Sequence, residues 1–295
     1  MLRRPGPPLL LALACLSLLA VTGVLAKLVP ITVQGDQRTL NGFVAFDEPR
    51  LGPLLNHIAH LANPGPYALA GLLLALVALA RGRWRIALLI PVVFVLTGTT
   101  TEALKHLLAA PRLDEWLGSS QIAASSWPSG HSTAAMTMAL CAVLAAPPRL
   151  RPTVAALGGA FALAVAYAIL TLGWHFPSDV FGGYLVAATY VLIGVAVVAA
   201  ADQRWPTRRA AEAVTRPIDL VPALAVAVLA AGLAIGLAIT RPHRIVGYAQ
   251  VHTTFVVGAL GIAVLAAALA TMMALGFLRS TTSSSATRQT PARPS

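Results

Sequence analysis

The chain has 295 residues, of which 57% are hydrophobic and only 11% are charged. A soluble domain of this size carries about a quarter charged residues, so the composition excludes a soluble globular protein and requires a bilayer to take up the apolar excess. The net charge of +11 does not indicate a nucleic-acid-binding protein, because Lys and Arg accumulate in the cytoplasmic loops of membrane proteins.

The apolar residues occur in long uninterrupted runs, which predict helices rather than the alternating strands of an outer-membrane barrel. A helix needs about 20 such residues to cross the bilayer. We therefore expect an all-α integral membrane protein with about eight spans, of which the second and fourth are short. The predicted spans are Leu9–Val29, Pro66–Ala80, Ile86–Ala109, His131–Ala146, Thr153–Gly173, Val180–Ala201, Leu220–Thr240 and Thr254–Leu278. Cys15 and Cys141 lie inside these runs and are interpreted as small hydrophobic side chains.

The distribution of Lys and Arg predicts the orientation of the spans. With the N-terminus inside, the cytoplasmic segments hold twice as many Lys and Arg residues as the outer segments. Both termini are therefore predicted to be cytoplasmic. Arg3 and Arg4 before the first span, and Ala26 near its end, would also suit a cleaved signal peptide. The apolar run is longer than the usual ~7–15 residues, which favours a retained helix.

Between the first two spans, Ile31–Gly65 is a polar stretch expected on the outer side. Within it, Leu51–Ala62 has the spacing of an amphipathic helix lying on the membrane, with His57 and His60 toward its polar side as surface histidines rather than a metal pair. Its apolar face is expected to contain Leu54, Leu55, Ile58 and Leu61. The Ser/Thr/Pro/Arg-rich tail Ser280–Ser295 is predicted to be disordered.

Three polar clusters fall at the outer ends of the third to sixth spans. The first contains Lys105 and Arg112, seven residues apart, which places both cations on one face of a helix. Pro111 disfavours helix at Ala110 and lets Arg112 enter a loop. Two cations at the membrane interface could bind an anion. The alternative is that both side chains bury their apolar stems and simply extend their charged ends to the membrane surface, which gives the same spacing.

The second cluster is Trp127-Pro128-Ser129-Gly130-His131, directly before the fourth span. The start of a helix presents unsatisfied N–H groups and a partial positive charge, which together bind phosphate. Gly130 permits close approach, Ser129 adds a hydroxyl donor, and His131 can exchange a proton with the bound group. The alternative is a capped helix start with an incidental histidine.

The third cluster runs from Gly173 to Asp179 at the start of the sixth span. His175 and Asp179 are four residues apart, so the carboxylate can accept a hydrogen bond from one imidazole nitrogen and leave the other as a nucleophile or base. A histidine merely satisfied by a capping Asp is the structural alternative. Gly182 and Gly183 follow directly and predict close helix packing.

In this order, and on one side of the membrane, the clusters resemble the type 2 phosphatidic acid phosphatase superfamily, which shares its core with vanadium haloperoxidases. The family pattern is Lys-x6-Arg-Pro, then Pro-Ser-Gly-His, then Ser-Arg-x5-His-x3-Asp. This sequence has Lys105 to Arg112, Pro128 to His131, and His175 with Asp179. The resemblance covers roughly Phe43 to Ala201 and implies a six-helix phosphatase core with two extra C-terminal helices.

The sequence departs from the family pattern in two places. Leu113 stands where a proline is usual, and Ala168 and Ile169 stand where the third motif has Ser-Arg. The missing arginine removes a charge-assisted hydrogen bond of about 1.5–3 kcal/mol, on the order of a 10–100-fold loss in rate. We therefore expect a weakened or redirected enzyme rather than an inactive one. Glu102, one turn before Lys105, could pair with that lysine or with His106, and is expected to position Lys105 or to form a structural ion pair.

The resemblance also implies a division of the chain and a set of residue roles. The division is an N-terminal helix and outer loop (1–42), the phosphatase core (43–201), a cytoplasmic loop with two helices (202–279) and the tail (280–295). His175 is expected to attack phosphorus, with Asp179 orienting it and His131 acting as acid and then base. The residues expected to bind the phosphoryl oxygens are Lys105, Arg112, Ser129 and Gly130.

The expected substrate is a lipid phosphate or diphosphate, such as a polyprenyl diphosphate, phosphatidate or phosphatidylglycerol phosphate. It would be hydrolysed without a metal or cofactor on the outer face of a bacterial cytoplasmic membrane, since no Asp/His arrangement in the sequence suits a two-metal site. Membrane lipids are the expected partners, and nucleic acid is not. A lipid phosphotransferase with the same phosphohistidine, or a non-enzymatic lipid-phosphate binder or transporter, are the alternatives.

Overall fold

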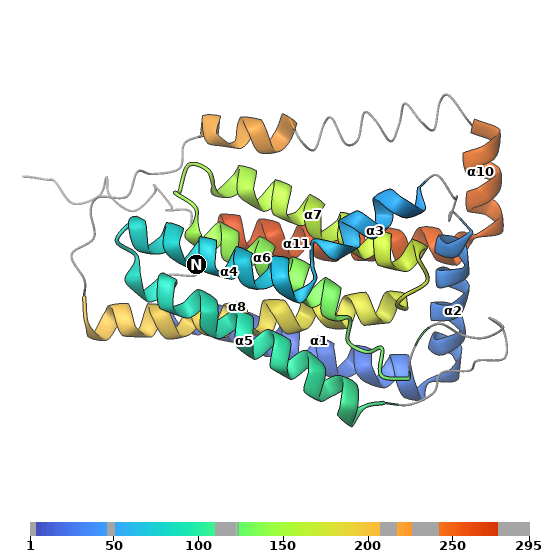
Figure 1. Cartoon of the computed structure of the whole chain (residues 1–295), viewed down its shortest axis with the longest axis horizontal. Helices are drawn as coiled ribbons and strands as arrows, with labels where there is room; N and C mark the ends of the chain where they lie inside the picture. The colour runs from blue at the N-terminus through green and yellow to red at the C-terminus, as the bar shows by residue number, and fades with distance from the viewer. Residues whose placement is uncertain are drawn as a thin grey trace, which may run out of the picture.

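The computed structural model describes residues 4–45, 51–109, 122, 124–206, 217–225 and 242–276, and every regular element within these ranges is a helix (Figure 1). The helices are α1 (Gly6–Leu28), α2 (Pro30–Val44), α3 (Gly52–His60), α4 (Pro64–Ala80), α5 (Trp84–Leu107), α6 (Gly130–Ala145), α7 (Arg151–Thr171), α8 (Pro177–Arg204), the 3-10 helix η2 (Pro217–Leu220), α10 (Pro242–Val251) and α11 (Thr253–Leu275). The expected all-helical architecture is confirmed for these ranges.

Five of the helices in the described ranges are long and apolar enough to cross a membrane, namely α1, α5, α7, α8 and α11. The helix α4 has 17 residues and joins α3 at a bend of 48°, so that the pair would provide a sixth candidate span. The helix α6 has only 16 residues. The second and fourth predicted spans are thus short, as expected. Most of the seventh, Leu220–Thr240, lies outside the described residues, as does the tail Ser280–Ser295, so the count of eight remains a prediction.

Large apolar side chains cover the outside of the helix bundle. Leu10 on α1, Val95 on α5 and Val264 on α11 are 69%, 62% and 65% exposed. Soluble proteins rarely expose apolar surface on this scale, because its contact with water is unfavourable. These faces suit contact with lipid acyl chains, and the protein is an integral membrane protein.

The helix α8 is the most buried of the five long helices and forms the centre of the bundle. It packs against α1, α5 and α6, while α7 packs between α6 and α11. Tyr184 on α8 is fully buried, and its hydroxyl donates to the carbonyl of Ala162 at 2.7 Å, which satisfies the one polar atom of that side chain. The last long helix is joined to the core in the same way, since the Tyr167 hydroxyl donates to the carbonyl of Ala259 on α11 at 2.8 Å.

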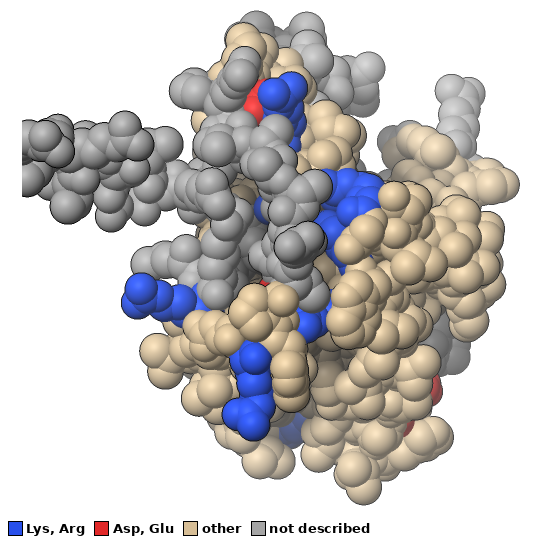
Figure 2. Space-filling view, turned by 90° about the vertical axis from the view of Figure 1, so that its left-hand side faces the viewer, with Lys and Arg blue, Asp and Glu red and all other residues tan. Residues whose placement is uncertain are grey.

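Basic side chains gather at the end of the bundle where α4 turns into α5. Arg81 and Arg83 donate to the last two carbonyls of α6, and Arg85 forms an ion pair with Asp202 near the end of α8. The last carbonyls of a helix have no partner within the helix, and cations stabilise them. Figure 2 shows this end with Lys and Arg more abundant than Asp and Glu. The cytoplasmic placement of this end stays a prediction.

The opposite end carries a helix that hydropathy did not predict. The polar stretch after the first span contains α2, which lies across the ends of the long helices (Figure 1). Thr39 on α2 donates to the carbonyl of Thr254 at 3.1 Å, and the ring of Phe43 lies 5.4 Å from that of Tyr167. The helix α2 is therefore fixed to both α11 and α7.

The predicted amphipathic helix is present as α3, and its large apolar residues divide between the protein core and the surface. Leu55 and Ile58 pack against the core, together with the buried Ala59, whereas Leu54 and Leu61 are exposed. The two exposed leucines are free to contact lipid, and the expected contact of this face with the membrane stays a prediction. The small Ala59 takes the centre of the contact because it allows α3 to approach α7 closely.

The first prediction concerns the Arg85–Asp202 pair. Both side chains are mostly buried, at 13% and 21% exposure, so Asp202→Ala leaves the Arg85 guanidinium without that carboxylate. We expect the variant to be less stable by about 1–3 kcal/mol, because an incompletely paired charge loses a charge-assisted hydrogen bond. Thermal unfolding in detergent measures this loss, with the exposed neighbour Gln203→Ala as the control. Equal melting temperatures for the two variants would contradict the assigned role.

Candidate active site

The start of α6 is docked directly onto the first turns of α8. The backbone N–H of Ser129 donates to the carbonyl of Asp179 at 2.9 Å. A Cβ atom at Gly183 would lie 2.7 Å from the Ser129 carbonyl oxygen, and one at Gly182 would lie 2.8 Å from Nε1 of Trp127. Only glycine fits at both positions, so the predicted close packing is confirmed. The contact brings the second and third clusters of the sequence together.

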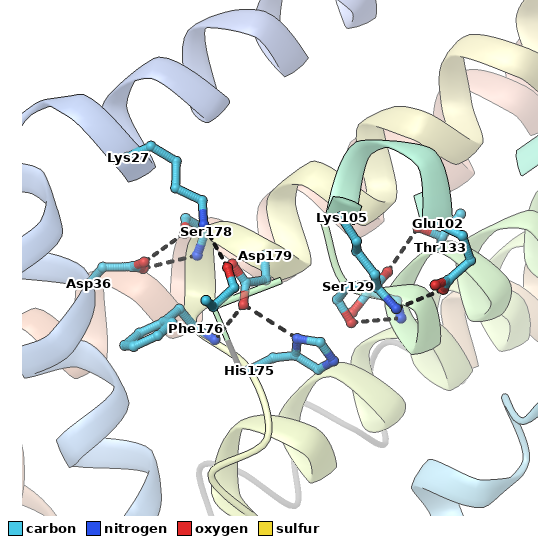
Figure 3. Close-up of polar contacts among 12 residues, drawn as sticks. Lys27, Asp36, Glu102, Lys105, Ser129, Thr133, His175, Phe176, Ser178 and Asp179 are labelled. Atoms are coloured by element: carbon cyan, nitrogen blue, oxygen red, sulfur yellow. Dashed lines mark hydrogen bonds and ion pairs between the residues drawn. The ribbon is translucent and has the colours of Figure 1, made fainter. Parts of the chain in front are cut away.

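The His175–Asp179 contact has the predicted form. Nδ1 of His175 lies 3.3 Å from Oδ2 of Asp179, and the same oxygen accepts a 3.0 Å hydrogen bond from the backbone N–H of Phe176. Asp179 is fully buried, so these donors replace the water that its carboxylate lacks. With Nδ1 directed at the carboxylate, Nε2 is the remaining ring nitrogen. Figure 3 shows the imidazole pointing from Asp179 toward Ser129 and Lys105.

His131 lies opposite His175, with 6.2 Å between the two ring centroids. Its Nε2 is 3.1 Å from Oδ1 of Asn63, and its ring lies 5.6 Å from that of Trp174. Asn63 can accept a hydrogen bond from a protonated Nε2, which selects one tautomer of the imidazole. Two imidazoles thus face one region at the N-terminal ends of α6 and α8.

The ammonium group of Lys105 lies over the turn at the start of α6. Its Nζ would be 3.4 Å from a Cβ atom at Gly130, and it donates to Oε1 of Glu102 at 2.7 Å. Lys105 is 21% exposed and Glu102 is 61% exposed, so the carboxylate faces outward while the lysine reaches inward. The expected pairing of these two residues is confirmed. Because Gly130 has no side chain, one anion could contact both the Lys105 ammonium group and the N–H groups at the start of α6.

Ser129 has a structural role in addition to any binding role. Its hydroxyl oxygen accepts a 3.3 Å hydrogen bond from the backbone N–H of Ser132, and the residue is the fully buried N-cap of α6. The capped helix start considered for the second cluster is therefore present. An N-cap serine keeps its hydroxyl hydrogen, which can still be donated to a ligand.

A cavity of about 350 Å³ opens beside this turn, between α4, α5 and α6. Its lining includes Lys105, Gly130, His131 and Asn63, together with Tyr67 on α4. His175 is not part of this lining and lies beyond His131. The cavity thus reaches the predicted phosphate-binding groups from the side of α4.

A buried apolar side chain, that of Ile169, occupies the position where the family pattern has an arginine. Ile169, near the end of α7, is fully buried and belongs to the hydrophobic core, as does Ala168. This position therefore adds no charge to the site. Arg112, the other predicted phosphate-binding cation, lies outside the described residues, and Leu113 does too.

Three contacts of the site were not predicted. The first is the contact of Asn63 with His131. Asn63 lies directly before α4, at a position where asparagine is a common helix N-cap, and this N-cap pattern is the one sequence feature that could have drawn attention to it. Trp174 belongs to the third cluster but was given no role, although its ring lies between those of His60 and His131 at 6.0 Å and 5.6 Å. His57 and His60 are exposed, as expected. The third is the contact of the Asp36 carboxylate with Ser178.

The comparisons with known proteins concern the helices that carry this site. Residues 84–203, which contain α5 to α8, match the family model of the PAP2 superfamily, and the resemblance drawn from the motifs is confirmed for this segment. A similar solved structure is the crystal structure of the first transmembrane PAP2 type phosphatidylglycerolphosphate phosphatase from Bacillus subtilis. It aligns with a TM-score of 0.52 at 20% identity over 67% of this chain and 98% of that chain, which shows a shared fold. No curated protein sequence matches the chain.

The second prediction concerns the docking of α6 on α8. Gly183→Ala places a methyl group 2.7 Å from the Ser129 carbonyl, so the turn must move away from Asp179. We expect a stability loss of about 1–3 kcal/mol, as for overpacking, and a larger proportional loss of any activity. Gly247→Ala on α10 is the matched control, because no atom lies within 4 Å of the added methyl group. A Gly183→Ala protein that unfolds and functions like this control would disprove the constraint.

Proposed function

We propose that the protein is a lipid phosphate phosphatase that works through a phosphohistidine intermediate. The observation that supports this best is the pair of facing imidazoles beside a helix start and a lysine. His131 and His175 are 6.2 Å apart at their centroids, and the buried Asp179 is directed at Nδ1 of His175. Neither a structural cap nor a simple anion site needs both histidines and the carboxylate.

The phosphoryl group would bind at the start of α6. The unsatisfied N–H groups of this first turn, including that of Gly130, point toward an anion at the helix end, and Lys105 neutralises part of its charge. The Ser129 hydroxyl and, by the family resemblance, Arg112 complete the set of donors. Because these donors are already in place, they stabilise the charge that develops on the phosphoryl oxygens in the transition state.

In the first step, Nε2 of His175 attacks phosphorus in line with the ester oxygen. A nitrogen–phosphorus bond forms as the bond from phosphorus to the leaving oxygen breaks, and protonated His131 gives its proton to that oxygen. Asp179 stabilises the positive charge that grows on the His175 ring. The products of this step are the free lipid alcohol (or lipid monophosphate, from a diphosphate) and phosphohistidine.

In the second step, neutral His131 takes a proton from a water molecule as that water attacks the phosphohistidine. The nitrogen–phosphorus bond breaks, inorganic phosphate leaves, and both histidines return to their starting states. No metal is required by this scheme, because cationic side chains and N–H groups meet the phosphate charge. Activity in EDTA is therefore expected.

The cavity between α4, α5 and α6 supports a lipid as the substrate. Lys105 and His131 line it, and the helices α4 and α5 that border it carry exposed leucine and valine side chains. A lipid phosphate or diphosphate would place its head group at the turn while its chains stay in the membrane. If the basic end of the bundle is cytoplasmic, this site lies on the outer face of the membrane.

The third prediction is the loss of turnover in His175→Ala. Purified protein in liposomes should release inorganic phosphate from at least one lipid of a panel of phosphatidate, phosphatidylglycerol phosphate and polyprenyl diphosphate, in EDTA, with inhibition by vanadate. Removing the nucleophile should lower this rate by at least about 10³-fold, as for other covalent catalysts. His57→Ala on the exposed face of α3 serves as the control. Robust turnover by His175→Ala would refute the assigned nucleophile.

The fourth prediction separates the two roles of His131. A substrate with a good leaving group, such as an aryl phosphate, does not need a general acid, so His131→Ala should still carry out the first step with it. Water activation is lost in the same variant, and phosphohistidine should therefore accumulate as an acid-labile, alkali-stable phosphoprotein. Phosphate labelling of the quenched protein measures this. Absence of label in His131→Ala, with wild-type protein active on the aryl ester, would contradict the assignment.

The buried Ile169 favours a second candidate function, that of a lipid-phosphate binder without turnover. Without a cation there, the site has fewer charges to stabilise a transition state, and a protein that binds lipid phosphates without turnover would keep Lys105 and the helix start. Binding of panel lipids without release of phosphate would favour this binder. Transfer of the phosphoryl group to an added lipid or sugar alcohol would instead favour a phosphotransferase.

A further inference from the structure

We propose that Asp36, on α2, is a positioning residue that aligns the His175–Asp179 pair by holding the first turn of α8. The proposal rests on the proposed function for its effect on catalysis, but its geometry is independent of it. Asp36 lies outside the segment that matches the PAP2 family model, and neither the motifs nor that match assigns it a role.

The contact between Asp36 and α8 has two hydrogen bonds. The backbone N–H of Ser178 donates to Oδ1 of Asp36 at 2.9 Å, and the Ser178 hydroxyl donates to Oδ2 at 2.6 Å. Figure 3 shows the carboxylate of Asp36 facing Ser178 from the opposite side to His175. Ser178 directly precedes Asp179, so the two bonds fix the backbone of the residue next to the buried carboxylate.

The start of α8 needs a partner of this kind. The first N–H groups of a helix have no acceptor within the helix, and Phe176, at the N-cap position, has no polar side chain to offer one. Asp179 accepts from the Phe176 N–H, and Asp36 accepts from the Ser178 N–H. A carboxylate at a helix N-terminus is also stabilised by the helix dipole. Asp36 thus acts as a cap supplied by another helix.

The helix that carries Asp36 is itself held in place from its other side. One turn further along α2, the Thr39 hydroxyl donates to the Thr254 carbonyl on α11, and the Tyr248 hydroxyl of α10 donates to the Gly42 carbonyl. Lys27, at the end of α1, also points toward Ser178 and Asp179 (Figure 3). The first two and last two described helices therefore support the catalytic pair from behind. This gives α2, α10 and α11 a part in the site.

Loss of Asp36 should disturb alignment more than phosphate binding. In Asp36→Ala both hydrogen bonds to Ser178 are lost, the first turn of α8 is free to shift, and His175 leaves its line with phosphorus. A misplacement of about 1 Å can cost on the order of 100-fold in rate. Lys105 and Gly130 are not in contact with Asp36. We therefore expect kcat to fall about 10–100-fold while KM changes by less than about threefold.

Two further variants separate positioning from general damage. Asp36→Asn keeps an oxygen for the Ser178 N–H and offers an amide N–H to the Ser178 hydroxyl, so it should restore most of the activity. Gln34→Ala, at an exposed position of the same helix, should behave as wild type. All proteins are assayed in liposomes with the lipid phosphate that wild type turns over fastest, and melting temperatures are recorded in parallel. Asp36→Ala with a kcat equal to that of Gln34→Ala would overturn the proposal.

A readout that needs no turnover distinguishes this proposal from the proposed function. In nanodiscs with ¹⁵N-labelled histidine, the Nδ1 proton of His175 shared with Asp179 should give a downfield resonance that His175→Ala lacks. The proposal predicts that this signal weakens in Asp36→Ala and returns in Asp36→Asn. If it does so in a protein without phosphatase activity, the proposed function fails and the positioning role stands. If it is unchanged in Asp36→Ala, the positioning role fails even in an active enzyme.

Discussion

The buried carboxylate group of Asp179 and the backbone around it are what the rest of the site depends on. The side chain binds Nδ1 of His175 and the Phe176 N–H, while the carbonyl of the same residue accepts from the Ser129 N–H. One residue therefore fixes both the proposed nucleophile and the helix start that would hold the phosphate. A fully buried carboxylate is costly unless donors surround it, so the fold has to keep these partners in place.

The close packing of α6 against α8 keeps these partners of Asp179 in place. The start of α6 can pack against α8 only because Gly182 and Gly183 have no side chains. Of the long helices, α8 is also the most buried. Around it, apolar faces meet lipid at the outside, and arginines satisfy helix ends at the end far from the site. The lipid-facing helices hold the bundle in the bilayer, and the polar contacts of the site lie at the opposite end from these arginines.

Local sequence patterns were sufficient for the parts of the site that local geometry determines. His175 and Asp179 are one helical turn apart, and Ser129 to His131 begin a helix, so short-range rules predicted both. Contacts between distant segments left no such pattern. Asn63 meets His131 across 68 residues, and Asp36 meets Ser178 across 142 residues. The helix α2 was missed because hydropathy detects apolar helices, whereas α2 is polar and is held by contacts with α7 and α11.

The most direct test of the central claim is an experimental structure of the protein with bound orthovanadate, which adopts the five-coordinate geometry of phosphoryl transfer. The account predicts vanadium bonded to Nε2 of His175, with its oxygens contacted by Lys105, the Gly130 N–H and His131, and with Asp179 still on Nδ1. Vanadate bound away from His175, or a His175 ring turned from Lys105 and the start of α6, would contradict the account.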